Sequence, residues 1–382
     1  MIMPRINNAR TPSARLFLRF AFIAVACLLA GCSKFEPIKI GFVDGLDGCA
    51  TDLGQASRDG ALLAVEHRNA KGGVNGRKIE LVVKNDEQKS EVAIKVVREL
   101  IADGVVAIVG HGTSTMSAAT APIANEAKTL MMSHTSTSKE LSNRYDYFFR
   151  VVNTTERYAV KNANFRRFNL KEKTIAAAYD MSNRAYSESW LEDFRTTFEK
   201  NGGKITTVVT FASGSRPSHA QIARQLLASK PDGILLIANS MHATLLAKEI
   251  RKINATVNLG TSEWAATEQL AEIGGDAVEG IYSSQFIERD SKKPAYVAFR
   301  SEYLQKFGKE PGYGGVAAYE ATNIILDALV KKKDNENLRE VILSTGTFSG
   351  LQGKIVFNSS RDADRPSYIT TVIKGIFQTY EN

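Results

Sequence analysis

The stretch EVAIKVVRELIADGVVAIVGHGTST, residues 91–115, holds a helix, a strand and the start of a polar loop in direct succession. Ile94, Val97 and Ile101 recur at helical spacing, and Gly104 ends that pattern. The apolar run VVAIVG (105–110) that follows has the length of a short buried strand. A helix that leads into a buried strand is the unit from which parallel α/β sheets are built.

The same alternation of strand and helix continues on both sides of this stretch. The first series predicts strands at 38–44, 78–86, 105–110 and 129–134, with helices at 56–70, 91–104 and about 116–127. The second series predicts strands at 174–180, 204–211, 233–239, 257–262 and 278–287, with helices at 187–200, 219–229, 243–254, 294–307 and 316–332. The tail segments 353–358 and 368–377 read as a β-hairpin-like finish. Two series of βα units predict an α/β fold of two lobes.

The amino terminus has the pattern of a bacterial export signal. Residues 1–19 contain four arginines and no acid, and an apolar run from about Leu16 to Ala30 leads to Leu-Ala-Gly-Cys at 29–32. That run is too short to span a bilayer comfortably. The Leu-Ala-Gly-Cys stretch resembles a lipobox, which implies that residues 1–31 are removed and that Cys32 carries diacylglycerol and palmitate. The alternative is an ordinary signal peptide with a chance cysteine.

Composition narrows the function further. The formal charge of +8 falls to +4 without the four leader arginines, and the remaining cations are scattered, so nucleic acid is not an expected partner. Loss of Cys27 and acylation of Cys32 would leave Cys49 as one free thiol. No Cys/His spacing suits a metal, and we expect no cofactor.

Two hydroxyl clusters follow neighbouring predicted strands, HGTST at 111–115 and HTSTS at 134–138. In open α/β sheets, ligands lie beyond the carboxyl ends of the strands, and the start of a helix offers free N–H groups to an anion. Each Ser or Thr here could instead be an ordinary helix cap. Two such clusters together favour a site that holds a small carboxylate.

A catalytic interpretation is weaker. The sequence has no G-x-S-x-G elbow and no phosphate-binding G-x-x-x-x-G-K-[ST] loop. His111 lies three residues before Ser114, which is a poor arrangement for a base that activates this serine. We therefore expect a binding protein and not an enzyme.

Several motifs carry a family resemblance. They are GALLAVEHRNAKGGVNGR (60–77) with Asn85-Asp86 after it, GHGTS (110–114), the loop SHTSTS (133–138), YFFR (147–150) and GLQGKIVF (350–357). Together they resemble the branched-chain amino-acid-binding proteins, which are type I periplasmic solute-binding proteins of ABC transporters. The resemblance spans about residues 38–377. It implies two doubly wound lobes joined by a hinge of three crossings, with an N-terminal lobe at 36–155 and 286–345 and a C-terminal lobe at 156–285 and 346–382.

The resemblance also implies a ligand site. The carboxylate-binding serine of the family falls on Ser114, and its second loop falls on Thr135 and Thr137. Its second-lobe aromatic falls on Tyr186, and the acid that meets the ligand's ammonium falls on Glu263. A surface aromatic at Tyr186 and a solvated capping acid at Glu263 remain the alternatives.

The chain departs from the family at two places that usually shape the side-chain pocket. The loop after the first strand reads DGLDGC (44–49) and lacks proline, and Ser240 stands where relatives carry an aromatic. Trp264 beside Glu263 is a further residue that could change the shape of the pocket.

Taken as a whole, the resemblance implies a monomeric receptor that delivers an amino acid or related carboxylate to an ABC permease. It would lie in the periplasm or outside the cell and be anchored to the membrane (the outer one, where it exists). The alternative is a sensor of an amine-free aromatic carboxylate or amide that signals through a separate partner.

Overall fold

The computed structural model describes residues 1–2, 36–48 and 51–380. The expected signal peptide, the lipidation site Cys32 and the thiol of Cys49 lie outside these residues. All helices and strands that the structure describes fall between Ile38 and Thr379, inside one compact unit that starts at Ile38. None of the described helices is long and apolar enough to cross a membrane.

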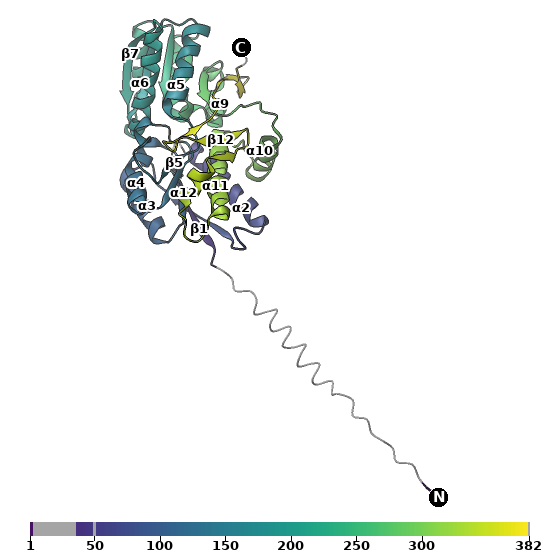
Figure 1. Cartoon of the computed structure of the whole chain (residues 1–382). Helices are drawn as coiled ribbons and strands as arrows, with labels where there is room; N and C mark the ends of the chain where they lie inside the picture. Colours follow the sequence, from purple (N-terminus) through teal and green to yellow (C-terminus); the bar gives the residue numbers. More distant parts are fainter. Residues whose placement is uncertain (3–35, 49–50, 381–382) are drawn as a thin grey trace. The chain divides into compact units, whose positions relative to one another are not determined.

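The first sheet has five parallel strands in the order β2-β1-β3-β4-β5. Their bounds are β1 (Ile38–Asp44), β2 (Ile79–Asn85), β3 (Ala107–Gly110), β4 (Leu130–Ser133) and β5 (Phe148–Arg150). The helices around this sheet are α2 (Asp52–Ala70), α3 (Ser90–Ala102), α4 (Ser114–Glu126), α10 (Pro294–Phe307), α11 (Gly312–Lys331) and α12 (Leu338–Thr345). Figure 1 shows α11 beside α2, and the two helices pack closely against each other.

The second sheet has seven strands in the order β15-β14-β10-β9-β8-β6-β7. Their bounds are β6 (Thr174–Asp180), β7 (Lys204–Phe211), β8 (Gly233–Ile237), β9 (Asn258–Thr261), β10 (Tyr282–Gln285), β14 (Tyr368–Ile373) and β15 (Ile376–Thr379). The helices α5 (Thr155–Asn164), α6 (Arg184–Lys200), α7 (His219–Ala228), α8 (Ser240–Ile253) and α9 (Glu268–Gly274) accompany it. The first five strands along the chain run parallel, and β14 and β15 are antiparallel.

The chain passes between the two sheets three times. It leaves the first sheet after β5, returns after β10 toward α10 and α11, and crosses again before β14. A small antiparallel sheet of β11 (Thr347–Ser349), β12 (Lys354–Phe357) and β13 (Ala363–Asp364) precedes the last crossing. The guanidinium of Arg150 at the end of β5 pairs with Asp362 at 2.6 Å, and this buried ion pair joins two of the crossings.

The predicted tail hairpin is wrong in its pairing. Residues 353–358 supply β12, which pairs with β11 and β13, whereas 368–377 supplies β14 and the start of β15. A true hairpin does form, but it lies wholly within the last strand pair, where Lys374 and Gly375 turn the chain at positive φ. Period-two alternation identifies strands without identifying their partners, so the sequence does not show that these two segments pair with other strands.

The buried face of α3 is also shifted from its prediction. Val97 is fully buried, but Ile94 and Ile101 are only partly buried. The buried stripe of this helix consists of Ala93, Val96, Val97 and Leu100. The buried stripe thus shares only Val97 with the predicted one, and Ile94 and Ile101 lie beside it.

Candidate ligand-binding cleft

The first hydroxyl cluster starts helix α4. Thr113 is the extended residue before the helix, and Ser114 is its first helical residue and is buried. The side-chain oxygen of Ser114 accepts hydrogen bonds from the backbone N–H groups of Thr137 and Ser138, both at 3.1 Å. Ser114 therefore binds the second hydroxyl loop to the positive end of α4.

The second hydroxyl loop follows β4 and is fixed to the first loop by its own side chains. The hydroxyl of Ser133 donates to the carbonyl of His111 at 2.8 Å, and the hydroxyl of Thr135 donates to the carbonyl of Gly112 at 2.7 Å. The Thr135 hydroxyl is thus engaged within the first lobe, which leaves the threonine's backbone as its contribution to the cleft.

The two histidines of these clusters do not face Ser114. Nδ1 of His111 lies 2.6 Å from a carboxylate oxygen of Asp86, and Nε2 of His134 lies 2.9 Å from one of Asp44. All four side chains are buried at the carboxyl edge of the first sheet. These two pairs hold both hydroxyl loops in place from the edge of the sheet. The two hydroxyl clusters therefore form a binding cradle and not a catalytic nucleophile with its base.

Glu263 faces the cradle from the second lobe. It begins the short helix η5 (Glu263–Ala265) after β9 and is buried. One carboxylate oxygen accepts from the hydroxyl of Thr137 at 3.2 Å, and the other accepts from the indole N–H of Trp190 at 2.8 Å. Burial raises the pKa of Glu263 to about 7, although hydrogen bonds to the carboxylate act in the opposite direction.

Aromatic rings enclose this carboxylate. Tyr186 on α6 meets Trp264 edge to face, with ring centroids 5.7 Å apart. Tyr313, near the start of α11, is also buried. Burial raises the pKa of Tyr313 well above its ordinary value, and the negative charges of Glu263, Asp52 and Asp44 raise it further. The electrostatic field in the cleft therefore favours a positive group.

The lobes are closed on one another around two small cavities. Each leaves about 10 Å³ open to the centre of a water molecule, which is room for about one water. One cavity is lined by residues that include Ser114, Thr135, Asn183, Tyr186, Glu263, Trp264 and Tyr313. The other is lined by residues that include Thr135, Thr137, Tyr158, Glu263, Gln285, Phe286 and Tyr313. A ligand larger than water therefore requires the lobes to move apart.

Helices α4 and α6 cap each other across the cleft. The backbone N–H of Thr115 donates to the side-chain oxygen of Asn183 at 3.1 Å. In return, the N–H of Ala185 donates to the hydroxyl of Thr115 at 3.2 Å. Each helix thus satisfies one orphan amide of the other, an exchange that exists only while the lobes touch.

The structure brings the five predicted residues Ser114, Thr135, Thr137, Tyr186 and Glu263 to the same two cavities. Sequence reasoning missed Trp190, Tyr313 and Asn183. Trp190 lies four residues after Tyr186 on the same helix face, which is a signal that could have found it. Ser240 is buried outside the lining of these two cavities, and its hydroxyl donates to a carboxylate oxygen of Asp52 at 3.1 Å. Within the described residues, no group of acids, histidines and cysteines could hold a metal.

Comparison with known proteins agrees with this architecture. The chain matches the periplasmic binding protein family over residues 37–375. The leucine-, isoleucine-, valine-, threonine- and alanine-binding protein of Pseudomonas aeruginosa is 26% identical over 358 residues, which cover 91% of this chain and 93% of that protein. A leucine-binding protein, LivK, from Thermotoga maritima has a TM-score of 0.84 and 26% identity, covering 90% of this chain and 98% of that one.

A more distant structure is a solute-binding protein from Rhodopseudomonas palustris BisB5 in complex with 3,4-dihydroxybenzoic acid. It has a TM-score of 0.81 and 20% identity, and covers 91% of this chain and 97% of that one. Two lobes with a candidate ligand cleft between them are the architecture of a solute-binding protein. The chain belongs to the periplasmic binding protein family and has the type I fold. It is similar to branched-chain amino-acid-binding members of that family. Members of this family bind substrates and are not enzymes.

Proposed function

We propose that this protein captures an α-amino acid between its two lobes and delivers it to an ABC import permease. The observation that carries the proposal is the position of Glu263, a buried carboxylate of the second lobe that faces the amino end of α4 across the cleft. Ser114 and the N–H groups near it suit a carboxylate, and Glu263 suits an ammonium. A zwitterion satisfies both lobes at once, so its binding favours the closed form. Hinge closure of this kind is characteristic of periplasmic binding proteins.

The geometry supports a set of proposed ligand contacts. In the proposed complex, Ser114 and the backbone of Thr135 and Thr137 hold the ligand's carboxylate from the first lobe, which requires the N–H of Thr137 to exchange its present acceptor, the side-chain oxygen of Ser114, for the ligand. Glu263 holds its ammonium, and Tyr186 covers it from the second lobe. The lobes that close are those of residues 36–155 with 286–345 and of residues 156–285 with 346–382, a division supported by the membership of the two sheets.

A thermal-shift screen of the mature chain against amino acids and small carboxylates tests the ligand class. A ligand at 100 times its dissociation constant stabilises the folded state by about 2.7 kcal/mol, a shift that is easily measured. We expect amino acids to raise the melting temperature. If only amine-free acids do so, the amino-acid assignment is wrong.

The lipid anchor is the second part of the proposal. The lipobox-like Leu-Ala-Gly-Cys at 29–32 supports acylation of Cys32 after export. We expect Cys32→Ser to move the protein from the membrane fraction to the soluble extracytoplasmic fraction. Membrane attachment that survives the substitution would contradict the anchor without affecting the ligand assignment.

An amine-free carboxylate is the second candidate ligand. Its support is the pKa of Glu263, which at about 7 leaves the group partly protonated at neutral pH and able to donate a hydrogen bond. The dihydroxybenzoate-bound and benzoate-bound relatives from Rhodopseudomonas palustris share the fold at 20% and 17% identity. A protein with such a ligand would act in uptake or in sensing through a separate partner. Whether the ligand is an amino acid or an amine-free acid depends on whether binding requires Glu263 to be charged.

A further inference from the structure

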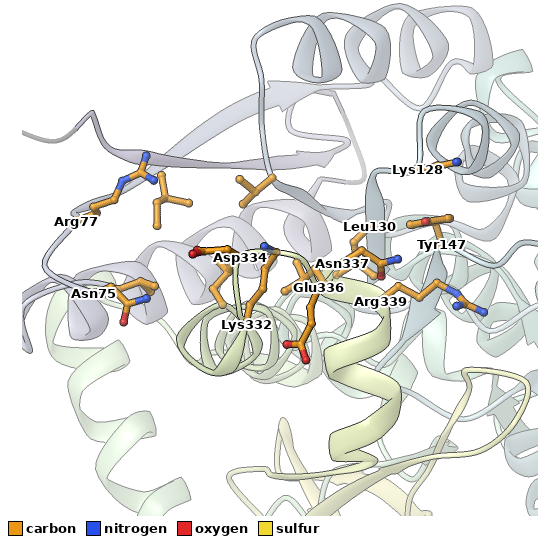
Figure 2. A pocket seen from close by; sticks show the side chains of 15 residues that line it. Asn75, Arg77, Lys128, Leu130, Tyr147, Lys332, Asp334, Glu336, Asn337 and Arg339 are labelled. Atoms are coloured by element: carbon orange, nitrogen blue, oxygen red, sulfur yellow. The ribbon is translucent and has the colours of Figure 1, made fainter.

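A cavity of about 490 Å³ lies at the opposite edge of the first sheet from the ligand cleft. Figure 2 shows its lining residues. Ile38 and Leu130 begin β1 and β4, and Val106 and Tyr147 immediately precede β3 and β5. The strands therefore start at this cavity and end at the cleft. Its volume falls within the range of about 300–1,000 Å³ that is usual for small-ligand sites.

The cavity combines an apolar lining with a charged rim. The apolar lining consists of Ile38, Val74, Val106, Leu130, Leu329 and Leu338. Val106 is 40% exposed, so part of this apolar lining is open to solvent. The rim carries the cations Arg77, Lys128, Lys332 and Arg339 and the acids Asp334 and Glu336, as Figure 2 shows.

Two rim lysines have no acidic partner. Among the ion pairs of the described residues, neither Lys128 nor Lys332 takes part in one. The loop that bears Lys332 also holds Lys333, which is exposed, directly after Lys331 at the end of α11. The rim is therefore cationic on balance, and it surrounds apolar surface.

The position of this cavity in the chain indicates what reaches it. Ile38 is both the first residue of β1 and part of the cavity wall. Only residues 33–37 separate it from Cys32, and a chain of this length spans at most about 20 Å. An acyl chain on Cys32 would thus hold the mouth of the cavity close to the phosphate layer of the membrane.

We propose that this cavity is a membrane-docking site that takes the phosphate headgroup of an anionic phospholipid. Lys128 and Lys332 contact the phosphate, and the apolar lining, which includes Val106, packs against the glycerol. The inference rests on the lipid anchor proposed above, which supplies the proximity. Docking would fix the first lobe on the membrane and leave the second lobe free to open and close.

Flotation of the non-acylated mature chain, residues 33–382, on vesicles tests the site separately from the anchor and from solute binding. Every described helix and strand lies within this chain. The vesicles are pure phosphatidylcholine or a 70:30 mixture of phosphatidylcholine and phosphatidylglycerol. We expect binding to the mixture alone, and binding that weakens as salt rises. Equal binding to both vesicles, or to neither, would overturn the proposal.

Matched variants locate the site. Lys128→Glu with Lys332→Glu should reduce partition to the anionic vesicles by roughly tenfold or more, since each cation near such a surface contributes about fivefold. Lys204→Glu with Lys230→Glu makes the same charge change at exposed lysines near the amino ends of second-sheet strands and should have little effect. Equal losses in the two pairs would reduce the effect to net charge and contradict a defined site.

Val106→Trp tests the role of the cavity separately from that of its charges, because it fills the apolar part of the cavity and leaves every lysine in place. We expect this variant to lose binding of dihexanoyl-phosphatidylglycerol in solution, with solute binding to the cleft unchanged. Parental affinity for this short lipid in Val106→Trp would place the headgroup outside the cavity. Binding of glycerol phosphate as strong as that of the short lipid would identify a soluble anion as the ligand and overturn the membrane assignment.

Discussion

Thr137 and Glu263 belong to opposite lobes, and the hydroxyl of the first donates to a carboxylate oxygen of the second at 3.2 Å. In the closed cleft, this hydroxyl occupies one of the positions from which an ammonium would approach Glu263. The indole N–H of Trp190 occupies the other oxygen. Ligand binding therefore exchanges donors at a carboxylate that is already in place, so the strength of binding depends on how much better an ammonium is than a hydroxyl.

This exchange predicts the relative effects of two substitutions. Glu263→Gln keeps the shape of the side chain but removes the charge, and it should weaken amino-acid binding by about 2–5 kcal/mol. Ser114→Ala removes one hydroxyl beside the remaining N–H groups and should cost about 1.5–3 kcal/mol. Isothermal calorimetry on both variants measures the order. Unchanged affinity in Glu263→Gln, with loss in Ser114→Ala, would show that the ligand carries no amine.

The raised pKa of Glu263 predicts a pH dependence of binding. An ammonium stabilises the ionised carboxylate, so binding lowers the pKa of Glu263 from about 7 and releases a proton. Affinity for an amino acid should then fall by roughly tenfold for each pH unit below 7 and level off above it. Calorimetry at pH 7 in two buffers with different ionisation enthalpies should detect release of about half a proton per ligand. Proton uptake would favour an amine-free acid.

The same shift predicts that Glu263 destabilises the ligand-free protein at high pH. The carboxyl group has a pKa near its ordinary value of 4.5 when unfolded and about 7 when folded. Below 4.5 both states are protonated and no stability is lost. Stability falls as the pH rises from 4.5 through 7, by about 3 kcal/mol in all. Glu263→Gln should therefore raise the melting temperature at pH 8 and change it little at pH 4. A lower melting temperature at pH 8 would contradict this assignment.

The ion pair of Arg150 and Asp362 predicts a large loss of stability. Arg150 is fully buried, and its guanidinium also donates to the carbonyls of Ser136 and Ser138 in the second hydroxyl loop. Arg150→Met leaves Asp362 buried without its counter-ion and should cost about 3–5 kcal/mol in urea unfolding. The control is Arg157→Met, because Arg157 and its partner Asp364 are exposed and pair at 3.6 Å. That variant should lose less than about 1 kcal/mol. Equal losses would remove the special role of Arg150.

The sequence predicts the two-lobed α/β fold because strand and helix periodicities are local properties. The predicted pairing of the tail strands is wrong because alternation does not identify partners: β12 pairs with its chain neighbours β11 and β13, whereas β14 pairs with β15 and with the distant β10. The helical spacing of Ile94, Val97 and Ile101 predicts one apolar stripe in α3, but the buried stripe consists of Ala93, Val96, Val97 and Leu100. Local patterns thus identify elements well and identify contacts poorly.

The same distinction between local patterns and long-range contacts applies to the candidate site. Family motifs led to Ser114 and Glu263, and the structure places both at one cavity. The hydroxyl of Thr135 cannot be assigned from sequence, since its acceptor is the carbonyl of Gly112 in another loop. Trp190 was missed because its bond to Glu263 depends on how α6 lies against η5. Long-range packing decides such contacts, and a single sequence does not record it.

The mutual capping of α4 and α6 through Thr115 and Asn183 has a consequence for turnover. It brings the positive ends of two helices together, and like charges repel. A carboxylate beside Ser114 lies near both ends and relieves the repulsion while it stays. On the proposed function, departure of the ligand restores this repulsion, which favours separation of the lobes and prepares the cleft for another ligand.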